Sequence, residues 1–326
     1  MRLDGADATA VAHAADLLAA GELVAFPTET VYGLGARADD ASAVAKIFSA
    51  KGRPADHPLI VHVADPAQIA FFAAELPALA QRLIDAFWPG PLTLILPRLP
   101  AVAEAAAGGQ NSIGLRCPSH PVARALLAAA REHGVPGVAA PSANRFGRIS
   151  PTRAAHVVDE FGDTLAVLEG GDSELGIESS IVDCSRGRPV LLRPGMLTRA
   201  HIEAAAGEPL LAPDSLAPRA PGTLDAHYAP NARLRLMPTD VLHTALQAMR
   251  EPPSTLAVYS RSAPPAAARG VRHRRMPAHA GQAAHELFSV LRELDAEGVQ
   301  LIWVEAPPAL PEWDGVRDRL TRAAAA

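Results

Sequence analysis

Ten consecutive residues combine hydroxyl groups, a carboxylate, a phenol and two glycines: Phe26-Pro27-Thr28-Glu29-Thr30-Val31-Tyr32-Gly33-Leu34-Gly35. Residues 22–26, which are largely apolar and lead into this stretch, are expected to form a strand. Ligands bind in the loops that follow strand ends in α/β proteins, so this segment is a candidate site. A tight turn whose polar groups bond one another explains the same residues, and a glycine pair alone does not define a nucleotide motif.

Helical and extended patterns alternate around this segment. Helices are expected at 9–20, 40–52 and 121–131, the first two ending at Gly21 and Gly52. Another helix is expected to begin at Asp65-Pro66, and a further one to end at Trp88. Further strands are expected at 59–63, 92–96, 112–116, 137–140, 165–168, 180–183 and 190–193. The alternation predicts the α/β class, with a buried, twisted mixed sheet and flanking helices.

A proline-rich stretch interrupts this pattern. Residues 209–230 contain five prolines and little periodicity, so we expect a domain at 1–208, a linker at 209–231 and a smaller α/β domain at 232–326, whose pattern is compatible with a doubly wound fold. The linker also contains His227 and Tyr228, which a plain spacer does not need. A linker of this kind could close over a site and supply a ring and a donor.

Composition excludes several classes of protein. The 326 residues carry a net charge of −5, which disfavours a constitutive nucleic-acid binder. The two cysteines, Cys117 and Cys184, form no CxxC pair, so a zinc ribbon is excluded and no metal site is expected. Apolar runs stop short of the ~20 residues that span a bilayer, and the N-terminus does not resemble a signal peptide. We expect a cytoplasmic protein without a membrane partner.

Two cations surround a glycine in Lys51-Gly52-Arg53-Pro54. Lys46 and Lys51 are the only lysines of the chain, where arginine is otherwise used. A fixed lysine and arginine suit a polyphosphate, the first as a compact charge and the second as a fork. Cations at a helix C-terminus are the alternative interpretation. We expect Lys51 and Arg53 to lie in an exposed loop.

Three other polar clusters lie within or beside expected strands. Ser112 and Arg116 could bind a carboxylate or phosphate, although an ordinary surface salt bridge is the favoured explanation of Arg116 when this cluster is taken alone. The small residues of 139–152 suit an anion nest before a helix, although Ser150 could merely cap that helix. His57 and His62 have no cysteine or third histidine nearby, so they do not indicate zinc.

These segments, taken together, resemble the YrdC-like threonylcarbamoyl-AMP synthases. The matching motifs occur in the family's order at 26–35, 51–54 with 58–62, 140–144 with 150–152, and 178–183. The linker and tail resemble the family's long form, which adds a small C-terminal Rossmann-like domain. The resemblance implies a YrdC-like twisted sheet and the reaction of L-threonine, bicarbonate and ATP to threonylcarbamoyl-AMP and pyrophosphate.

The resemblance also implies roles for individual residues. Lys51 and Arg53 would be catalytic. The residues expected to hold threonine are Thr30, His62, Arg116, Ala140 and Ser180. Those expected to hold the nucleotide are Lys51, Arg53, His57, Ser112, Ser142, Asn144, Ser150, Arg193, His227 and Tyr228. His57 stands where the family more often has asparagine, and 223–226 lack the basic character of some members' linkers.

The implied chemistry brings an anionic nucleophile to a polyanion, which requires cancelled charge and an in-line geometry. Mg²⁺ would accompany ATP on its phosphates, without a dedicated protein site. The product would pass to the machinery that threonylcarbamoylates the adenosine next to the tRNA anticodon, and direct tRNA binding would be weak.

Two rival functions stay open from the residues. One is carbamoyl transfer, as in the related module of hydrogenase-maturation proteins, although the chain lacks the zinc-finger and acylphosphatase-like segments of those proteins. The other is RNA binding, which the negative net charge and the absence of alternating aromatic and basic residues disfavour.

Overall fold

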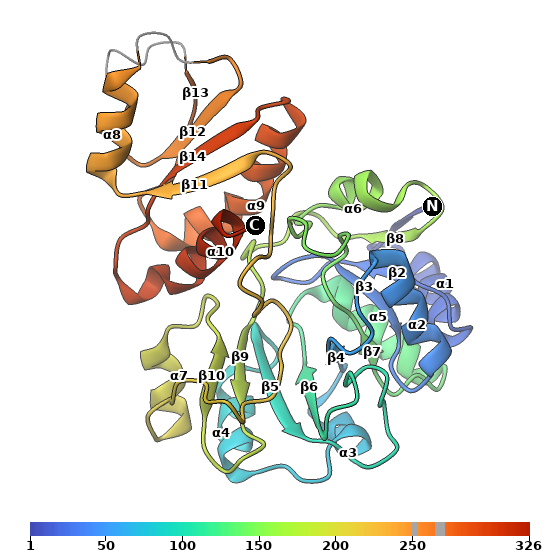
Figure 1. The fold of residues 1–326 in the computed structure, drawn as a ribbon. Coiled ribbons are helices and arrows are strands. Elements are labelled where there is room, and N and C mark those ends of the chain that lie inside the picture. Colours follow the sequence, from blue (N-terminus) through green and yellow to red (C-terminus); the bar gives the residue numbers. More distant parts are fainter. Residues whose placement is uncertain (250–252, 265–270) are drawn as a thin grey trace. The chain divides into compact units, whose positions relative to one another are not determined.

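The computed structural model describes residues 1–249, 253–264 and 271–326. By contact they divide into two compact units (Figure 1). The first contains Met1–Phe146 and Ser150–Thr223, and the second contains Gly147–Ile149 and Leu224–Ala326. The expected linker is thus shared between the units, and the domain boundaries inferred from sequence stay predictions.

The first unit is built on one ten-stranded mixed sheet, in the order β1-β8-β2-β3-β7-β4-β6-β5-β9-β10. Its strands are β1 (Arg2–Asp4), β2 (Val24–Phe26), β3 (Gly33–Arg37), β4 (Ile60–His62), β5 (Leu92–Pro97), β6 (Ser112–Arg116), β7 (Val138–Ala139), β8 (Ala166–Glu169), β9 (Ser180–Asp183) and β10 (Val190–Arg193). Its α-helices are α1 (Ala8–Ala19), α2 (Ala41–Lys51), α3 (Ile69–Phe72), α4 (Ala78–Phe87), α5 (Pro121–Glu132), α6 (Ala154–Phe161) and α7 (Arg199–Ala206). The expected mixed α/β class is confirmed.

Helix ends follow the local sequence. Asp40 caps α2 by accepting from the Ser42 amide, and Gly52 ends the helix in the left-handed region at φ 63°, as expected for a C-terminal glycine. Helix α1 is capped by Asp7, although the sequence placed its start at Thr9. Asp65 caps a 3-10 turn that begins at Pro66, as expected, and the separate helix α4 ends at Phe87 with Trp88 as its C-cap, where the sequence predicted a helix end.

Strand register places the polar clusters near one another. Strands β4 and β6 are parallel, so His62 and Arg116 are direct neighbours at their carboxyl ends. Strands β5 and β9 are also parallel, and Leu92 pairs with Ser180 at their beginnings. Strand β3 begins at Gly33, inside the segment that the sequence treated as a loop, and pairs antiparallel with β2. The segment 27–32 is therefore a short connection between two adjacent strands.

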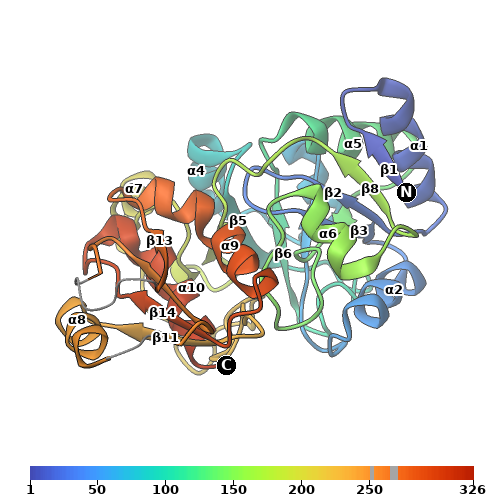
Figure 2. The same ribbon diagram turned by 90° about the horizontal axis from the view of Figure 1, so that it is seen from above.

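The second unit contains a four-stranded parallel sheet in the order β11-β14-β12-β13 (Figure 1), and Figure 2 shows the same unit from above. Leu242 and Leu246 of α8 pack on Leu256, Val258 and Trp303, on one face of this sheet. On the opposite face Tyr259 donates to Glu286 of α9. Its elements are β11 (Arg233–Met237), α8 (Thr239–Ala248), β12 (Leu256–Ser260), β13 (Arg272–Arg275), α9 (Ala280–Ala296), β14 (Leu301–Glu305) and α10 (Asp314–Ala324).

Candidate active site

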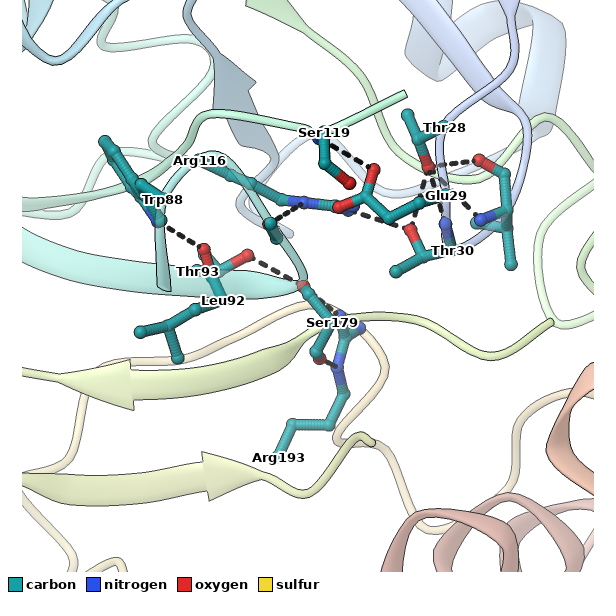
Figure 3. Close-up of polar contacts among 12 residues, drawn as sticks. Thr28, Glu29, Thr30, Trp88, Leu92, Thr93, Arg116, Ser119, Ser179 and Arg193 are labelled. Carbon is teal, nitrogen blue, oxygen red and sulfur yellow. Dashed lines mark hydrogen bonds and ion pairs between the residues drawn. The ribbon is translucent and has the colours of Figure 1, made fainter. Parts of the chain in front are cut away.

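A buried ion pair lies beside the connection between β2 and β3 (Figure 3). The guanidinium of Arg116 lies 2.6 Å from the Glu29 carboxylate, and neither side chain is more than 4% exposed. Arg116 also donates to Thr30 Oγ1 at 2.9 Å and to the Gly90 carbonyl at 3.2 Å. The surface salt bridge considered from the sequence is therefore wrong, because this cation is enclosed and bound by three groups.

The hydroxyls of Thr28 and Thr30 share one hydrogen bond of 2.8 Å. Thr28 Oγ1 also donates to the Val31 carbonyl at 2.7 Å, so Thr30 donates to Thr28 and accepts from Arg116. The Ser119 amide donates to the second Glu29 oxygen at 3.2 Å. The connection between the strands is thus rigid, and it fixes the direction of the Arg116 guanidinium.

Two buried side chains near this ion pair keep unused hydrogen-bonding capacity. Within the described residues, His62 Nδ1 and Ser180 Oγ have no hydrogen-bond partner, and these residues are 3% and 0% exposed. Burial and the neighbouring Arg116 lower the pKa of His62 to about 3, so its imidazole is neutral. An unpaired buried polar atom costs free energy, which a bound polar ligand can recover. Ala140, expected in the same set, is buried and donates its amide to the Ile60 carbonyl on β4.

A chain of polar contacts leads from this region to Arg193. Ser179 is the residue before Ser180, and its hydroxyl forms a hydrogen bond of 2.8 Å with the hydroxyl of Thr93. Arg193 donates to the Ser179 carbonyl at 3.1 Å and to its hydroxyl at 3.2 Å. Its third contact, 2.9 Å long, is to the Pro221 carbonyl. Arg193 is therefore held by fixed acceptors, as Figure 3 shows for Ser179.

Lys51 is buried, not exposed as the sequence suggested. It is the last residue of α2 and only 3% exposed. Its ammonium donates to the Ser142 carbonyl at 2.6 Å and to the Asn144 carbonyl. Burial, and then the charge of Arg53, hold the pKa of Lys51 well below its usual range. Lys51 therefore organises the backbone of the segment that carries two of the expected nucleotide-binding residues.

Arg53 and His57 both lie against the ring of Phe146. The Arg53 guanidinium is 5.8 Å from the ring centroid and donates to the Pro58 carbonyl at 2.9 Å. The His57 ring is 5.4 Å from the same ring, in an edge-to-face arrangement. Partial burial, and then Arg53, lower the pKa of His57. Arg53, at 9% exposed, is also more enclosed than an exposed loop would allow.

The remaining expected residues lie in different surroundings. Asn144 donates to the Arg145 carbonyl at 2.7 Å, and Ser150 donates to Glu178. Ser112 is half-buried at the first position of β6. His227 and Tyr228 belong to the second unit, where Tyr228 stacks on Phe288 with a centroid separation of 5.4 Å. Tyr228 is 1% exposed and has a φ of 62°, and closure over a site stays a prediction.

Sequence reasoning gave no role to Glu29, Glu178 or Ser179. All three stand inside motifs that were singled out, so the motifs were the available signal. Their roles as partners of Arg116, Ser150 and Arg193 depend on contacts between residues that are distant in the sequence, which spacing alone does not give.

The described part of the chain lacks two further features. It contains no group of three or more histidine, cysteine or acidic residues that could hold a metal ion. The described helices include none long and apolar enough to cross a membrane.

Comparisons with known proteins add to these observations. The family model Sua5_yciO_yrdC, described as telomere recombination, matches residues 16–195. The model Sua5_C, described as the C-terminal domain of threonylcarbamoyl-AMP synthase, matches residues 197–325.

Curated relatives carry the same description. The threonylcarbamoyl-AMP synthase of Bacillus subtilis is 46% identical over 232 residues, which are 69% of this chain and 66% of that protein. The match therefore spans slightly less than two thirds of that relative. The synthase of Schizosaccharomyces pombe is 34% identical over 348 residues, 92% of this chain and 84% of the relative. The crystal structure of Pyrococcus abyssi Sua5 complexed with L-threonine superposes with a TM-score of 0.88 at 34% identity, covering 99% of this chain and 97% of that one.

Proposed function

The chain belongs to the threonylcarbamoyl-AMP synthase family, in the long form with a C-terminal domain, and we propose that it is a nucleotidyltransferase making threonylcarbamoyl-AMP. The substrates are L-threonine, bicarbonate and ATP, which enters as its magnesium complex. The observation that carries the proposal is the buried group of Arg116, Thr30, His62 and Ser180. It offers one fixed cation and two unused polar atoms, all of them buried.

This group suits a small amino acid. A carboxylate is recognised well by a guanidinium of fixed direction. His62 and Ser180 are neutral and can bond an amine or a hydroxyl. Glu29 already balances the charge of Arg116, so the site suits a zwitterion better than a dianion. The Pyrococcus abyssi relative, crystallised in complex with L-threonine, supports the same choice.

The reaction proceeds in two steps. The threonine amine attacks the bicarbonate carbon and forms an N-carboxylate, with loss of water. One oxygen of that carboxylate then attacks the α-phosphorus of ATP, forming a P–O bond while the bond to pyrophosphate breaks. Positioned positive charge is the main requirement for such a transfer. We assign this task to Lys51, Arg53 and Arg193, with hydrogen bonds from Ser142, Asn144 and Ser150.

Lys51 has a particular part in this scheme. Its bonds to the Ser142 and Asn144 carbonyls hold its ammonium against the segment 142–144. Burial lowers the pKa of Lys51 in this position. An incoming phosphate would favour its charged form. We further propose that the product serves tRNA threonylcarbamoylation next to the anticodon, in the cytoplasm, through a separate transferase machinery.

A product assay tests the proposal. Purified protein with ATP, Mg²⁺, bicarbonate and L-threonine should release pyrophosphate and form an acyl-adenylate, and omission of threonine or bicarbonate should abolish both. Pyrophosphate release that is independent of threonine would overturn it. Valine should be nearly inert, because a site that bonds a hydroxyl rejects analogues without one. Serine keeps the hydroxyl and lacks only a methyl group, so it should be a poor but detectable substrate.

The rival functions are tested alongside. Carbamoyl transfer is disfavoured by the match of residues 197–325 to a domain named for the synthase. Filter binding of tRNA at two salt concentrations separates a binding module from an enzyme, since non-specific binding weakens steeply with salt.

A further inference from the structure

Three residues inside an expected nucleotide-binding segment belong by contact to the second unit. Gly147–Ile149 group with Leu224–Ala326, although Phe146 before them and Ser150 after them belong to the first unit. In sequence they lie between Asn144 and Ser150, both assigned above to the nucleotide.

Each of the three residues has its own contact within the second unit. The Ala229 amide donates to the Gly147 carbonyl at 2.8 Å. Arg292, on α9, donates to the Ile149 carbonyl. The Arg148 side chain donates to the Asn231 side chain and lies 3.5 Å from the Asp295 carboxylate. The whole tripeptide is therefore held, through backbone and side chain alike.

Asp295 is itself a fixed anchor. One of its oxygens accepts from the Asn231 amide at 2.6 Å and the other from the Ala232 amide at 2.9 Å. The Asp295 side chain is 9% exposed, against 34% for Arg148. Because α9 is 17 residues long and buries nine of them, Arg292 and Asp295 stand on a rigid support.

The two ends of the segment are held within the first unit. The Asn144 carbonyl accepts from Lys51, and the Phe146 amide donates to the Lys51 carbonyl at 2.8 Å. The Ser150 hydroxyl donates to Glu178. Only Gly147–Ile149 connects these two anchored ends, so their hold in the second unit restricts the backbone on both sides.

We propose that Arg292 and Asp295 are positioning residues for nucleotide binding, acting through Gly147–Ile149 on Asn144 and Ser150. This inference rests on the function proposed above. According to this inference, the second unit raises the affinity for ATP without supplying a catalytic group. When the tripeptide is released, the segment 142–152 populates more conformations. The apparent affinity for the nucleotide then falls with the fraction that remains competent. Thr30, His62 and Arg116 lie outside this segment, so threonine affinity is preserved.

The test uses the full-length chain with Arg292→Ala and Asp295→Ala. The KM for ATP should rise about 5- to 20-fold, as expected when the competent fraction falls by that factor. The KM for threonine should change less than about twofold, since additivity holds between separate sites. Arg292→Lys keeps one donor for the Ile149 carbonyl and should recover part of the loss, which a purely structural role would not predict.

Arg272→Ala is the matched control. It also removes an arginine from a carbonyl, that of Glu297, in the second unit but away from Gly147–Ile149. Its kinetics should match those of the wild type. If Arg292→Ala does not fold, Arg148→Ala takes its place, because it removes the contacts of the same tripeptide with Asn231 and Asp295 and should raise the KM for ATP in the same way.

Hydrogen exchange separates this inference from the proposed function. Amides of 144–150 should exchange faster in Arg292→Ala than in Arg272→Ala, whether or not ATP turnover occurs. Wild-type protein without threonine-dependent pyrophosphate release would contradict the proposed function alone. Unchanged exchange in 144–150, or an unchanged KM for ATP in an active Arg292→Ala protein, would overturn the positioning role.

Discussion

The Glu29 carboxylate and the Arg116 guanidinium, 87 residues apart in sequence, lie 2.6 Å from each other in the interior of the first unit. Taking two charges out of water is costly, and a buried pair is retained only where both ions have further partners. Here the Ser119 amide and Thr30 hydroxyl supply them. The pair therefore holds a buried guanidinium in a fixed direction, next to His62 on the neighbouring strand.

Glu29→Gln should weaken threonine binding more than ATP binding. The amide keeps the shape and one acceptor, but Arg116 loses its counter-charge and its fixed direction. We expect the threonine KM to rise at least tenfold, and the free energy of unfolding to fall by about 3–5 kcal/mol, as when a buried pair loses one partner. Initial rates at varied threonine and urea unfolding measure the two effects.

Glu132→Gln is the control for this change. Glu132 pairs with Arg131 at the surface, with a side chain that is 73% exposed, so its loss should alter neither quantity measurably. A Glu29→Gln protein with wild-type threonine KM would remove the ion pair from the substrate site.

Lys51→Met should nearly abolish product formation and also lower stability. Methionine fills the buried volume, but the Ser142 and Asn144 carbonyls lose a charged donor. We expect a loss of ~1–3 kcal/mol in the free energy of unfolding. Because the folded pKa of Lys51 is lowered, the unfolded chain binds the proton more tightly, and wild-type stability should rise with pH relative to Lys51→Met. Urea unfolding at pH 7 and pH 9 checks the sign. An unchanged difference between the two proteins would refute the lowered pKa.

Many of the helices and strands can be predicted from the sequence because the signals that define them are local. Gly52 follows a helix and takes the left-handed conformation there, as its position predicts. Strands β5, β6, β9 and β10 are short apolar runs bounded by turn residues. Failures occurred where distant packing decides. Lys51 carries a charge at a helix end, which normally indicates exposure, yet carbonyls 91 and 93 residues later enclose it. The sequence assigns no role to Glu29 because its partner, Arg116, lies on a strand far along the chain. Strand β3 is not predicted because its glycines and polar neighbours are typical of a loop.

His62 predicts a specific loss of stability in acid. Its folded pKa is about 3, below its unfolded value near 6.5. Stability is therefore full above pH 6.5 and falls as the pH drops toward 3, because the unfolded chain takes up the proton first. The slope from one such group is at most ~1.4 kcal/mol per pH unit. Urea unfolding of wild type and His62→Gln between pH 4 and 7 should show a shallower dependence in the variant. Parallel curves for the two proteins would mean that His62 titrates normally.

Ser179 should control ATP use through the orientation of Arg193. Its hydroxyl accepts from Arg193 and bonds Thr93, so Ser179→Ala removes one of the acceptors that hold the guanidinium. Thr93→Val keeps the shape of Thr93 and leaves the direct bond between Ser179 and Arg193 intact. Since Arg193 keeps the carbonyls of Ser179 and Pro221 in both variants, the fold should survive.

We expect the KM for ATP to rise about tenfold in Ser179→Ala, the usual effect of losing one charged hydrogen bond. Thr93→Val should change it by less than about threefold, and threonine KM should stay near wild type in both, as for separate sites. Equal effects of the two variants on the KM for ATP would show that the hydroxyl pair acts through packing and not through Arg193.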